Sequence, residues 1–267
     1  MKKTNTEKYN SIKITHYNIL KGGEDRLNKI NKVIEEMNPD VCGLLETVGW
    51  DKNISKYKKI YKTMGYKFFY FAKANSKYNI TILSKIKIQT STINKGVRHV
   101  IVGVKITDKN YTPLNIYYVH LSPISEEDRL DEIEILLKKI SRQENTIIMG
   151  DFNSLSLSDK YNEKRLLNKF LQNNIVKYGT TYLKFDVIPK IEKMGFIDAF
   201  RFTGNKFDHS VPTKCNVDIN HKEKLRIDYA FVKNKIIKNI KICQIYKSET
   251  SDTASDHYPL NLIYENK

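Results

Sequence analysis

Polar side chains follow several apolar runs of this sequence, and their types are those that bind metal ions and move protons. The run TIIMG, residues 146–150, is followed by Asp151 and Asn153, which stand where a buried strand would leave the core. Other strand-like runs start or end in the same way, and the full set of eight residues is Asn18, Glu46, His120, Asp151, Asn153, Asp228, Asp256 and His257. One such residue is typical of a turn or a solvated loop, but side chains at the ends of separate strands can converge on one site.

The chemistry that suits this set is the attack of water on a phosphate ester. The sequence has neither a nucleophilic serine or cysteine motif nor a glycine-rich phosphate loop. Uncatalysed phosphate ester hydrolysis needs a rate gain on the order of 10¹⁷ or more, whereas one acid–base group supplies about 10²–10⁴. A divalent cation, a base for the water, a donor to the developing oxyanion and a stabiliser of the leaving oxygen are needed, and the set contains candidates for each.

The elements that position these residues are predicted from hydrophobic periodicity. Strands at 11–19 and 41–46 flank a helix whose apolar residues, from Leu27 to Met37, recur at helical spacing. A second helix begins after Ser125, where SEED supplies an N-cap and acids for the first turn. Further strands are expected at 66–71, 79–84, 97–107, 114–122, 146–151, 225–232, 240–246 and 258–264. These strands are too many for one sheet, so we expect an α/β fold with two sheets and with helices on their outer faces.

Length and composition favour one globular unit. The 267 residues are 40% apolar, and no repeat, low-complexity tract or Pro/Gly/Ser linker marks a boundary, so we expect a tail at 1–10 and a single domain at 11–267. The three cysteines form no C-x-x-C pattern, which disfavours both a zinc site and a disulfide framework. We therefore expect a cytoplasmic monomer without stable membrane association.

Positive charge is concentrated in one part of the chain. The net charge is +16, and the stretch from Lys52 to Thr107 holds twelve lysines and Arg98 but no Asp or Glu. Tyrosines and phenylalanines are interleaved with these cations, a mixture typical of a surface that binds nucleic acid. A solvated lysine-rich surface, as in proteins from AT-rich genomes, would have the same composition, and both interpretations stay open.

Six short motifs carry a resemblance to a known family: THYNIL (15–20), LLE (44–46), YVHLS (118–122), MGDFNS (149–154), RIDYAF (226–231) and SDHYP (255–259). In this order and at these spacings they resemble the endonuclease/exonuclease/phosphatase superfamily, which includes pancreatic-type deoxyribonucleases, exonuclease III-like repair enzymes, deadenylases, inositol polyphosphate 5-phosphatases and neutral sphingomyelinases. The resemblance extends from about Ser11 to Glu265. It implies a deoxyribonuclease-like fold, a four-layer α/β/β/α sandwich of two packed mixed β-sheets flanked by helices. It also implies a phosphoesterase that depends on Mg²⁺, with Mn²⁺ as the alternative ion.

The resemblance also implies roles for the polar residues. Glu46, assisted by Asn18 and Asp256, would hold a Mg²⁺ that keeps several waters and touches a phosphate oxygen. Asp151 would orient or deprotonate the attacking water. Asn153 would donate its amide to a non-bridging phosphate oxygen.

Histidines complete the implied mechanism. His257, held by Asp228 through one ring nitrogen, would present the other to the phosphate, because a carboxylate partner favours the charged ring. His120 would support the leaving oxygen. In the pancreatic-type enzymes a glutamate between the second and third motifs supports that histidine, but residues 52–107 contain no acid, so another group must orient His120.

Several other residues are assigned by weaker signals. Candidate substrate-binding residues are Arg201, Lys73, Lys77 and Arg98. For Arg201, in the segment GFIDAFR, a phosphate contact and a structural salt bridge are both open. His16 and His99 lie within strand patterns and are interpreted as packed residues.

Three functions are compatible with these observations. A nuclease or nucleic-acid phosphodiesterase is favoured by the acid-free basic stretch and predicts activity that weakens with salt. An inositol-phosphate or sphingomyelin-type phosphoesterase is the alternative, although KLRIDYAFV differs from the pattern typical of 5-phosphatases. A binding protein without activity is disfavoured because all eight polar residues are present. Abasic-site repair is also disfavoured, because those enzymes resemble a pattern with tyrosine near the position of His120.

Overall fold

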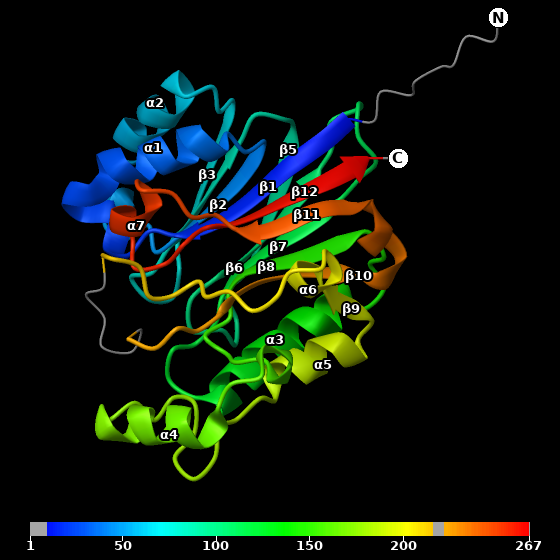
Figure 1. Cartoon of the computed structure of the whole chain (residues 1–267). Helices are drawn as coiled ribbons and strands as arrows, with labels where there is room; N and C mark the ends of the chain where they lie inside the picture. The colour runs from blue at the N-terminus through cyan, green and yellow to red at the C-terminus, as the bar shows by residue number, and fades with distance from the viewer. Residues whose placement is uncertain (1–9, 216–221, 267) are drawn as a thin grey trace, which may run out of the picture.

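Two six-stranded β-sheets pack face to face, and helices cover their outer faces (Figure 1). The computed structural model describes residues 10–215 and 222–266. The architecture confirms the four-layer α/β/β/α sandwich predicted from the sequence. Of the expected tail, residues 1–9 lie outside the described residues, and Asn10 already belongs to the first strand.

Each sheet combines parallel and antiparallel strands. The first sheet contains β1 (Asn10–Asn18), β2 (Val41–Leu45), β3 (Phe68–Ala72), β4 (Ile80–Ser84), β11 (Ile240–Ile245) and β12 (Leu260–Asn266), in the order β11-β12-β1-β2-β4-β3. The second contains β5 (Ile88–Ile93), β6 (Ile101–Ile106), β7 (Asn115–His120), β8 (Thr146–Asp151), β9 (Phe196–Asp198) and β10 (Asp228–Lys233), in the order β5-β6-β7-β8-β10-β9. The mixed sheets are therefore built around the pairs β1/β2 and β7/β8, which are parallel.

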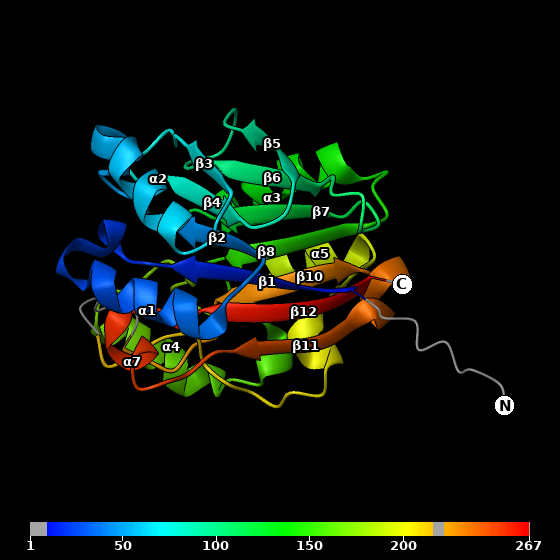
Figure 2. The same ribbon diagram turned by 90° about the horizontal axis from the view of Figure 1, so that it is seen from above.

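Helices connect the parallel pairs and cover the sheets. The α-helices are α1 (Leu27–Met37), α2 (Ile54–Thr63), α3 (Glu126–Ile140), α4 (Glu163–Gln172), α5 (Val187–Lys193), α6 (Ala199–Phe202) and α7 (Ser251–Ala254). Short 3-10 helices are η1 (Lys21–Arg26), η2 (Trp50–Asn53), η3 (Leu157–Asp159) and η5 (Asn234–Asn239). Helices α1 and α2 lie along the outer side of the first sheet (Figure 2). Their apolar side chains pack on that face, and those of α3 and α5 pack on the second sheet.

Crossover helices bring the ends of the parallel strands to one side of the sandwich. Helix α1 joins β1 to β2, and α3 joins β7 to β8. As predicted, α3 follows an N-cap, because the Ser125 hydroxyl accepts a hydrogen bond of 3.1 Å from the Asp128 N–H. Since both strands of a parallel pair end at the same edge, the residues that follow them lie close together.

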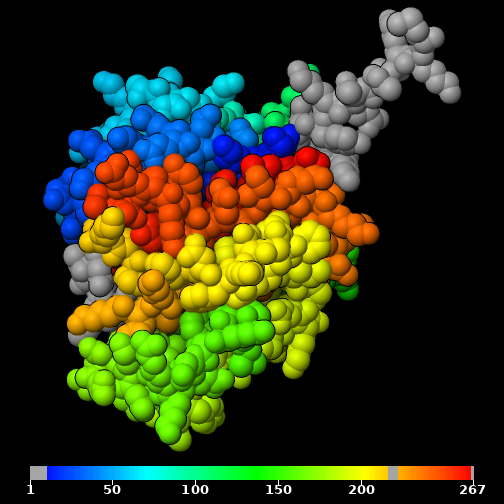
Figure 3. Space-filling model, viewed as in Figure 1, coloured from blue at the N-terminus to red at the C-terminus, as the bar shows by residue number. Residues whose placement is uncertain are grey.

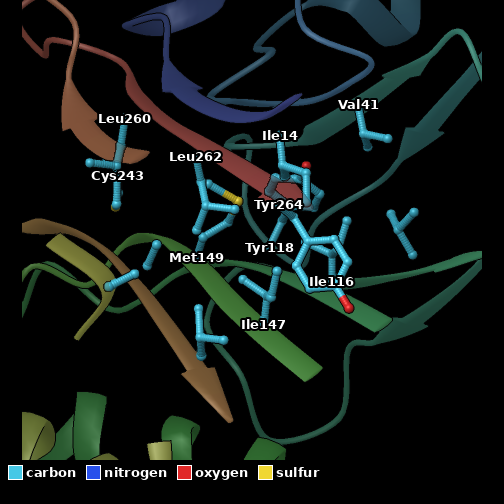
Figure 4. Close-up of a cluster of buried hydrophobic side chains, with 14 of the residues drawn as sticks. Ile14, Val41, Ile116, Tyr118, Ile147, Met149, Cys243, Leu260, Leu262 and Tyr264 are labelled. Carbon is cyan, nitrogen blue, oxygen red and sulfur yellow. The ribbon is translucent and has the colours of Figure 1, made fainter. Parts of the chain in front are cut away.

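The core between the sheets leads directly to this edge. On β1, Ile12 and Ile14 are buried between the sheets, and alternation puts His16 and Asn18 on the same face. The same change from apolar to polar occurs on β8, where Ile147 and Met149 precede Asp151. Figure 4 shows Ile14 of the first sheet above Ile147 and Met149 of the second. The strand ends therefore carry polar groups out of a packed apolar layer.

Some elements differ from the sequence prediction. Strand β5 was not predicted, because IQTSTI has apolar residues only at its two ends and lies at a sheet edge. Helix α2 was also not predicted, because its ten residues include four lysines and one fully buried side chain, Tyr61. The predicted strand at 97–107 is shorter, and β6 begins at Ile101. Residues 97–100 instead form a loop that approaches the strand ends.

The edge strand β11 of the first sheet is contacted by the segment that follows β9 of the second sheet and includes α6. The side chains of Thr203 and Asn205, just after α6, donate hydrogen bonds of 3.3 and 2.7 Å to the Cys243 carbonyl of β11. Figure 3 shows α6 in yellow beside β11 in orange on this surface. Within residues 10–215 and 222–266, no helix is both long and apolar enough to cross a membrane.

Candidate active site

All eight polar residues predicted from the sequence are brought together where strands of both sheets leave the core. The first sheet contributes Asn18, Glu46, Asp256 and His257, and the second contributes His120, Asp151, Asn153 and Asp228. The register supports this meeting, because Asp151 is paired with His120 on one side and with Asp228 on the other.

A cavity of about 150 Å³ opens at this point. Its wall is formed by Leu20, Lys21, Glu46, Tyr78, His99, His120, Pro123, Asp151, Asn153, Lys177, Asp256 and His257. Asn18 contacts Glu46, and Asp228 contacts His257, so both support the wall from behind. Larger hollows of about 530 Å³ beside α4 and about 520 Å³ between α3 and α5 contain none of the eight residues. The smaller cavity is therefore the candidate active site.

The amide of Asn18 links two of the carboxylates of the cavity, those of Glu46 and Asp151. Its Nδ2 donates hydrogen bonds of 3.2 Å to Glu46 Oε1 and of 3.2 Å to Asp151 Oδ2. Its Oδ1 accepts a hydrogen bond of 3.1 Å from the Leu20 N–H, which fixes the direction of the amide. Asn18 thus holds carboxylates from different sheets next to each other.

Backbone conformations that are rare for non-glycine residues are concentrated around the cavity. Glu46 has φ of 61° and Asn153 has φ of 49°, and the neighbouring Leu20 and Lys21 have φ of 51° and 50°. The Lys21 N–H donates a hydrogen bond of 2.9 Å to Glu46 Oε2, and the Glu46 carbonyl accepts from two further backbone N–H groups. Such conformations cost energy and persist where surrounding bonds hold them, as they do here.

Asp228 lies between two imidazole rings. Its Oδ2 is 2.8 Å from His257 Nδ1, and its Oδ1 is 2.8 Å from His16 Nε2, although the latter contact lacks the angle of a hydrogen bond. Burial opposes the charge on His257, but Asp228, followed by Asp256 and Asp151, raises its pKa to about 10. Burial alone would raise the pKa of Asp228, but His257 and His16 lower it well below its usual range. His257 is therefore protonated at neutral pH.

His16 was interpreted from the sequence as a packed strand residue, and it is fully buried. Its contact with Asp228 nevertheless makes it part of the site. The alternation of β1 was the available signal, because His16 lies two residues before Asn18 on the same face.

Asn153 is held by three neighbours. Its N–H donates a hydrogen bond of 2.9 Å to Asp151 Oδ1, and its Nδ2 donates one of 3.2 Å to the Leu121 carbonyl. Its Oδ1 accepts a hydrogen bond of 3.0 Å from Lys177 Nζ. Lys177, which was not singled out in the sequence, comes from the segment between α4 and α5 and is 8% exposed.

His120 is oriented by aromatic rings. Its Nε2 lies 3.6 Å from Asp151 Oδ2 and 3.9 Å from Glu46 Oε1. The His99 ring stacks on it, with ring centroids 4.5 Å apart and an angle of 24° between the planes. The Tyr78 ring makes a T-shaped contact with it, with ring centroids 6.0 Å apart. Both rings come from the stretch at residues 52–107, which contains no acid. A histidine and a tyrosine of this stretch therefore lie against His120, where the pancreatic-type pattern would have a glutamate.

The His99 ring is uncharged. Burial, followed by His120 and Arg98, lowers the pKa of His99 to about 2. Its Nδ1 lies 2.6 Å from the Ser76 hydroxyl, whose oxygen accepts the Tyr78 N–H at 3.1 Å. The serine proton is therefore available to His99 Nδ1. His99 was predicted to be packed, and it is buried, but it also lines the cavity.

Helix α3 fixes the loops that surround the cavity. The buried guanidinium of Arg129 donates hydrogen bonds to the Ser122 carbonyl, the Ser154 hydroxyl and the Lys177 carbonyl, at 3.0, 3.0 and 2.6 Å. Glu132 accepts hydrogen bonds from the N–H groups of Arg98 and Ser122. The loops that carry His99, His120, Asn153 and Lys177 are thus tied to one helix.

The predicted substrate-binding residues have different surroundings. Lys73, Lys77 and Arg98 are exposed on the loops that contribute Tyr78 and His99, and Lys77 Nζ lies 5.4 Å from the centre of the Tyr78 ring. The guanidinium of Arg201 instead pairs with the buried carboxylate of Asp159. For Arg201 the structure thus favours the structural salt bridge over the predicted phosphate contact.

A family comparison agrees with this geometry. The model of the Endonuclease/Exonuclease/phosphatase family matches residues 15–257. The chain belongs to the endonuclease/exonuclease/phosphatase family. The family consists of enzymes that hydrolyse phosphate esters, and metal dependence is typical of its members. The resemblance recognised from the six motifs is thereby confirmed.

Solved structures with the same fold include several members of this family. The 3′ phosphatase NExo from Neisseria, bound to product DNA hairpin, is 15% identical with a TM-score of 0.71, covering 95% of this chain and 99% of that chain. The AP endonuclease from Archaeoglobus fulgidus is 16% identical with a TM-score of 0.71, at 95% and 99% coverage. Humanized D. rerio TDP2 is 16% identical with a TM-score of 0.64, at 96% and 99% coverage. No curated protein matches the sequence.

The acidic residues fit the divalent ion that the family implies. Glu46 has a side chain 13% exposed on the cavity wall, and Asp151 and Asp256 line the same cavity, which gives oxygen ligands of the kind that Mg²⁺ prefers. Asp151, Asp228 and His257 also each offer one potential ligand atom, and these three atoms lie within 4.8 Å of one another. Both oxygens of Asp228 already face imidazole nitrogens at 2.8 Å, so Glu46, Asp151 and Asp256 are better placed to offer oxygen ligands.

Proposed function

We propose that this enzyme hydrolyses phosphodiester bonds in nucleic acid and depends on Mg²⁺. The observation that carries the proposal is the meeting of Glu46, Asp151 and a protonated His257 on the wall of one cavity. In this proposal, residues 11–267 form one catalytic domain, and the protein acts as a monomer in the cytoplasm.

Glu46, with Asp256 beside it, would hold the Mg²⁺. Bound there, the ion supplies positive charge to a phosphate oxygen and thereby stabilises the charge that develops in the transition state. Asn18 acts through its amide Nδ2, which donates hydrogen bonds of 3.2 Å to Glu46 Oε1 and of 3.2 Å to Asp151 Oδ2. We therefore assign Asn18 to holding the carboxylates in place.

Asp151 accepts the proton of the attacking water. Its Oδ1 accepts from the Asn153 N–H, and its Oδ2 accepts from Asn18 Nδ2 and also lies 3.6 Å from His120 Nε2 and 3.7 Å from His257 Nε2. Because Oδ2 faces the two histidine nitrogens that are assigned to the substrate, we assign Oδ2 as the oxygen that takes the proton. The water oxygen then bonds to phosphorus as the bond to the leaving oxygen breaks.

Two nitrogen donors stabilise the phosphate group. His257 donates Nδ1–H to Asp228, so its Nε2–H is directed to a non-bridging oxygen, and the Asn153 amide donates to a second one. His120 stabilises the leaving oxygen through Nε2, with His99 and Tyr78 maintaining the ring orientation.

Nucleic acid is the substrate class supported by the surroundings of the cavity. Loops from the acid-free stretch contribute Tyr78 and His99 to the wall and expose Lys73, Lys77 and Arg98 around it. Cations beside rings suit a phosphate backbone and stacked bases. Among the solved relatives, NExo is bound to a product DNA hairpin and the Archaeoglobus fulgidus protein is an AP endonuclease.

A substrate panel tests the proposal. The purified protein is incubated with plasmid DNA, single-stranded DNA, poly(A), a 5′-tyrosyl oligonucleotide, sphingomyelin and inositol phosphates, each with Mg²⁺ or with EDTA. We expect Mg²⁺-dependent cleavage of a nucleic acid, and a loss of about 10³-fold or more in kcat/KM for Asp151→Asn and for His257→Ala. Turnover of sphingomyelin or inositol phosphates alone would support the alternative function and contradict the proposal.

Salt dependence tests the basic loops separately. For a nucleic-acid substrate, Lys77→Gln is expected to reduce the slope of log kcat/KM against log salt by about one. Lys139→Gln, an exposed lysine on α3, is the matched control and should leave the slope unchanged. Equal slopes for both variants would assign the lysines of the acid-free stretch to a merely solvated surface.

A further inference from the structure

Lys177 places a buried positive charge in the wall of the active-site cavity. Its side chain contacts the Asn153 Oδ1 at 3.0 Å and lies 5.0 Å from the centre of the Tyr178 ring. Burying an ammonium group is costly, and a lysine held in an active-site wall at that cost is a candidate for binding an anionic substrate group.

The backbone of Lys177 is held rigidly. Its carbonyl accepts a 2.6 Å hydrogen bond from Arg129, a residue with no exposed surface. The adjacent Tyr178 stacks on Phe170 of α4 with ring centroids 4.8 Å apart. Arg129 also bonds the loops that follow β7 and β8, so the ammonium is fixed relative to the catalytic residues before substrate arrives.

The bond to Asn153 places the ammonium beside a predicted phosphate donor. Because Asn153 Oδ1 accepts from Lys177, the amide nitrogen is directed to the other side, where one of its hydrogens goes to the Leu121 carbonyl. The amide nitrogen and the ammonium are both donors, and both residues line the cavity in which a phosphate would bind.

Lys177 adds positive charge to a wall that carries carboxylates. Glu46, Asp151 and Asp256 line the cavity, and their negative charges repel a phosphate group. Lys21 is also on the wall but is exposed, whereas Lys177 is 8% exposed and lies beside Asn153. Solvent therefore screens the attraction between Lys177 and a phosphate less than that of Lys21.

We propose that Lys177 binds a non-bridging oxygen of the scissile phosphate, next to Asn153. The inference rests on the proposed function, since it names a residue that recognises the phosphate in that reaction. Negative charge on the non-bridging oxygens is stabilised by a fixed ammonium without reorganisation, so Lys177 acts on the transition state as well as on binding.

The first test measures phosphate binding without turnover. Isothermal titration calorimetry with inorganic phosphate, in the presence of Mg²⁺, compares the wild type with Lys177→Met, Lys177→Arg and Lys184→Met. We expect Lys177→Met to weaken phosphate binding by about tenfold or more, and Lys177→Arg to retain most of the affinity. Lys184 lies on the same segment but pairs with Glu127 at the surface, so Lys184→Met should bind phosphate as the wild type does.

The second test separates phosphate binding from support of Asn153. Lys177→Gln can still donate to Asn153 Oδ1 but carries no charge, so we expect it to remain as impaired as Lys177→Met, with kcat/KM lowered by about 10²-fold and an unchanged Tm. Recovery of phosphate affinity and turnover by Lys177→Gln would show that the lysine only orients Asn153. Wild-type phosphate affinity in Lys177→Met would also overturn the inference.

These outcomes are distinct from failure of the proposed function. If the wild type cleaves no phosphate ester of the panel, the proposed function fails. The phosphate affinities of the Lys177 and Lys184 variants still decide whether Lys177 binds phosphate.

Discussion

Replacing Asp228 by Asn removes one negative charge and almost no volume from the interior of the site. In the wild type, the Asp228 carboxylate faces His257 Nδ1 at 2.8 Å and has no exposed surface. The asparagine oxygen can still accept the His257 N–H, so the geometry of the ring is retained while its electrostatic support is lost. We expect the variant to fold and to lose most of its activity at pH 8.

The size of the effect follows from the pKa of His257. Burial lowers this pKa, whereas Asp228, followed by Asp256 and Asp151, raises it to about 10. Compared with an ordinary histidine pKa of about 6.5, this difference favours the protonated ring by an amount on the order of 5 kcal/mol. Without the Asp228 charge, the pKa of His257 falls, because burial remains and only Asp256 and Asp151 still oppose it. A smaller fraction of the rings is then protonated at pH 8 to offer a positive charge to the phosphate.

The same shift predicts a pH-dependent stability. Because the pKa of His257 is higher in the folded state, protonation stabilises the wild type fully below about pH 6.5, and this contribution is lost as the pH rises toward 10. Urea unfolding of the metal-free protein between these pH values should show the loss in the wild type and a much flatter profile in Asp228→Asn.

Activity supplies the second measurement. We expect kcat/KM at pH 8 to fall by about 10²–10³-fold in Asp228→Asn, and to stay unchanged in Asp131→Asn, an exposed carboxylate on α3. If Asp228→Asn keeps both the wild-type kcat/KM and the wild-type pH dependence of unfolding, the carboxylate does not maintain the charge of His257 and the reasoning is refuted.

Three further substitutions give independent predictions. Glu46→Gln should weaken Mg²⁺ binding, measured by calorimetry, by about tenfold or more, and wild-type affinity would exclude Glu46 as a ligand. His99→Ala should lower kcat by about tenfold with little change in KM. His99→Phe keeps a ring against His120 and should recover most of the lost kcat. An equal loss of kcat in both variants would exclude stacking as the cause. Gly150→Ala should destabilise the protein by about 3 kcal/mol or more in urea unfolding, because its Cβ would lie 1.9 Å from a β7 carbonyl oxygen, whereas Gly204→Ala, with open space around it, should cost about 1 kcal/mol. Equal losses for the two glycines would contradict the steric argument.

Strand alternation explains why much of the site could be predicted from the sequence. On β7, Ile116 and Tyr118 are buried between the sheets and His120 continues the same face. On β10, Asp228 shares a face with Ala230 and Val232, which belong to the same core. Residues at the polar end of an apolar face therefore carry a signal that can be read before the strands are assembled.

Loop residues of the site carry no comparable signal. His99 reaches the cavity because its carbonyl accepts the Asn75 N–H and Glu132 holds the adjacent Arg98 N–H. Lys177 reaches it through the bond from Arg129. These contacts join segments far apart in the sequence, and periodicity describes only the residues within one element.

The position of β12 has a consequence for protein synthesis. This strand is inserted between β11 and β1, and His257 lies three residues before its start at Leu260, whereas Asn18 ends β1. A ribosome therefore releases β1 long before the strand that pairs with its free edge, and His257 leaves the exit tunnel after every other residue of the site. Under the proposed function, a nascent chain therefore has no complete active site before His257 emerges.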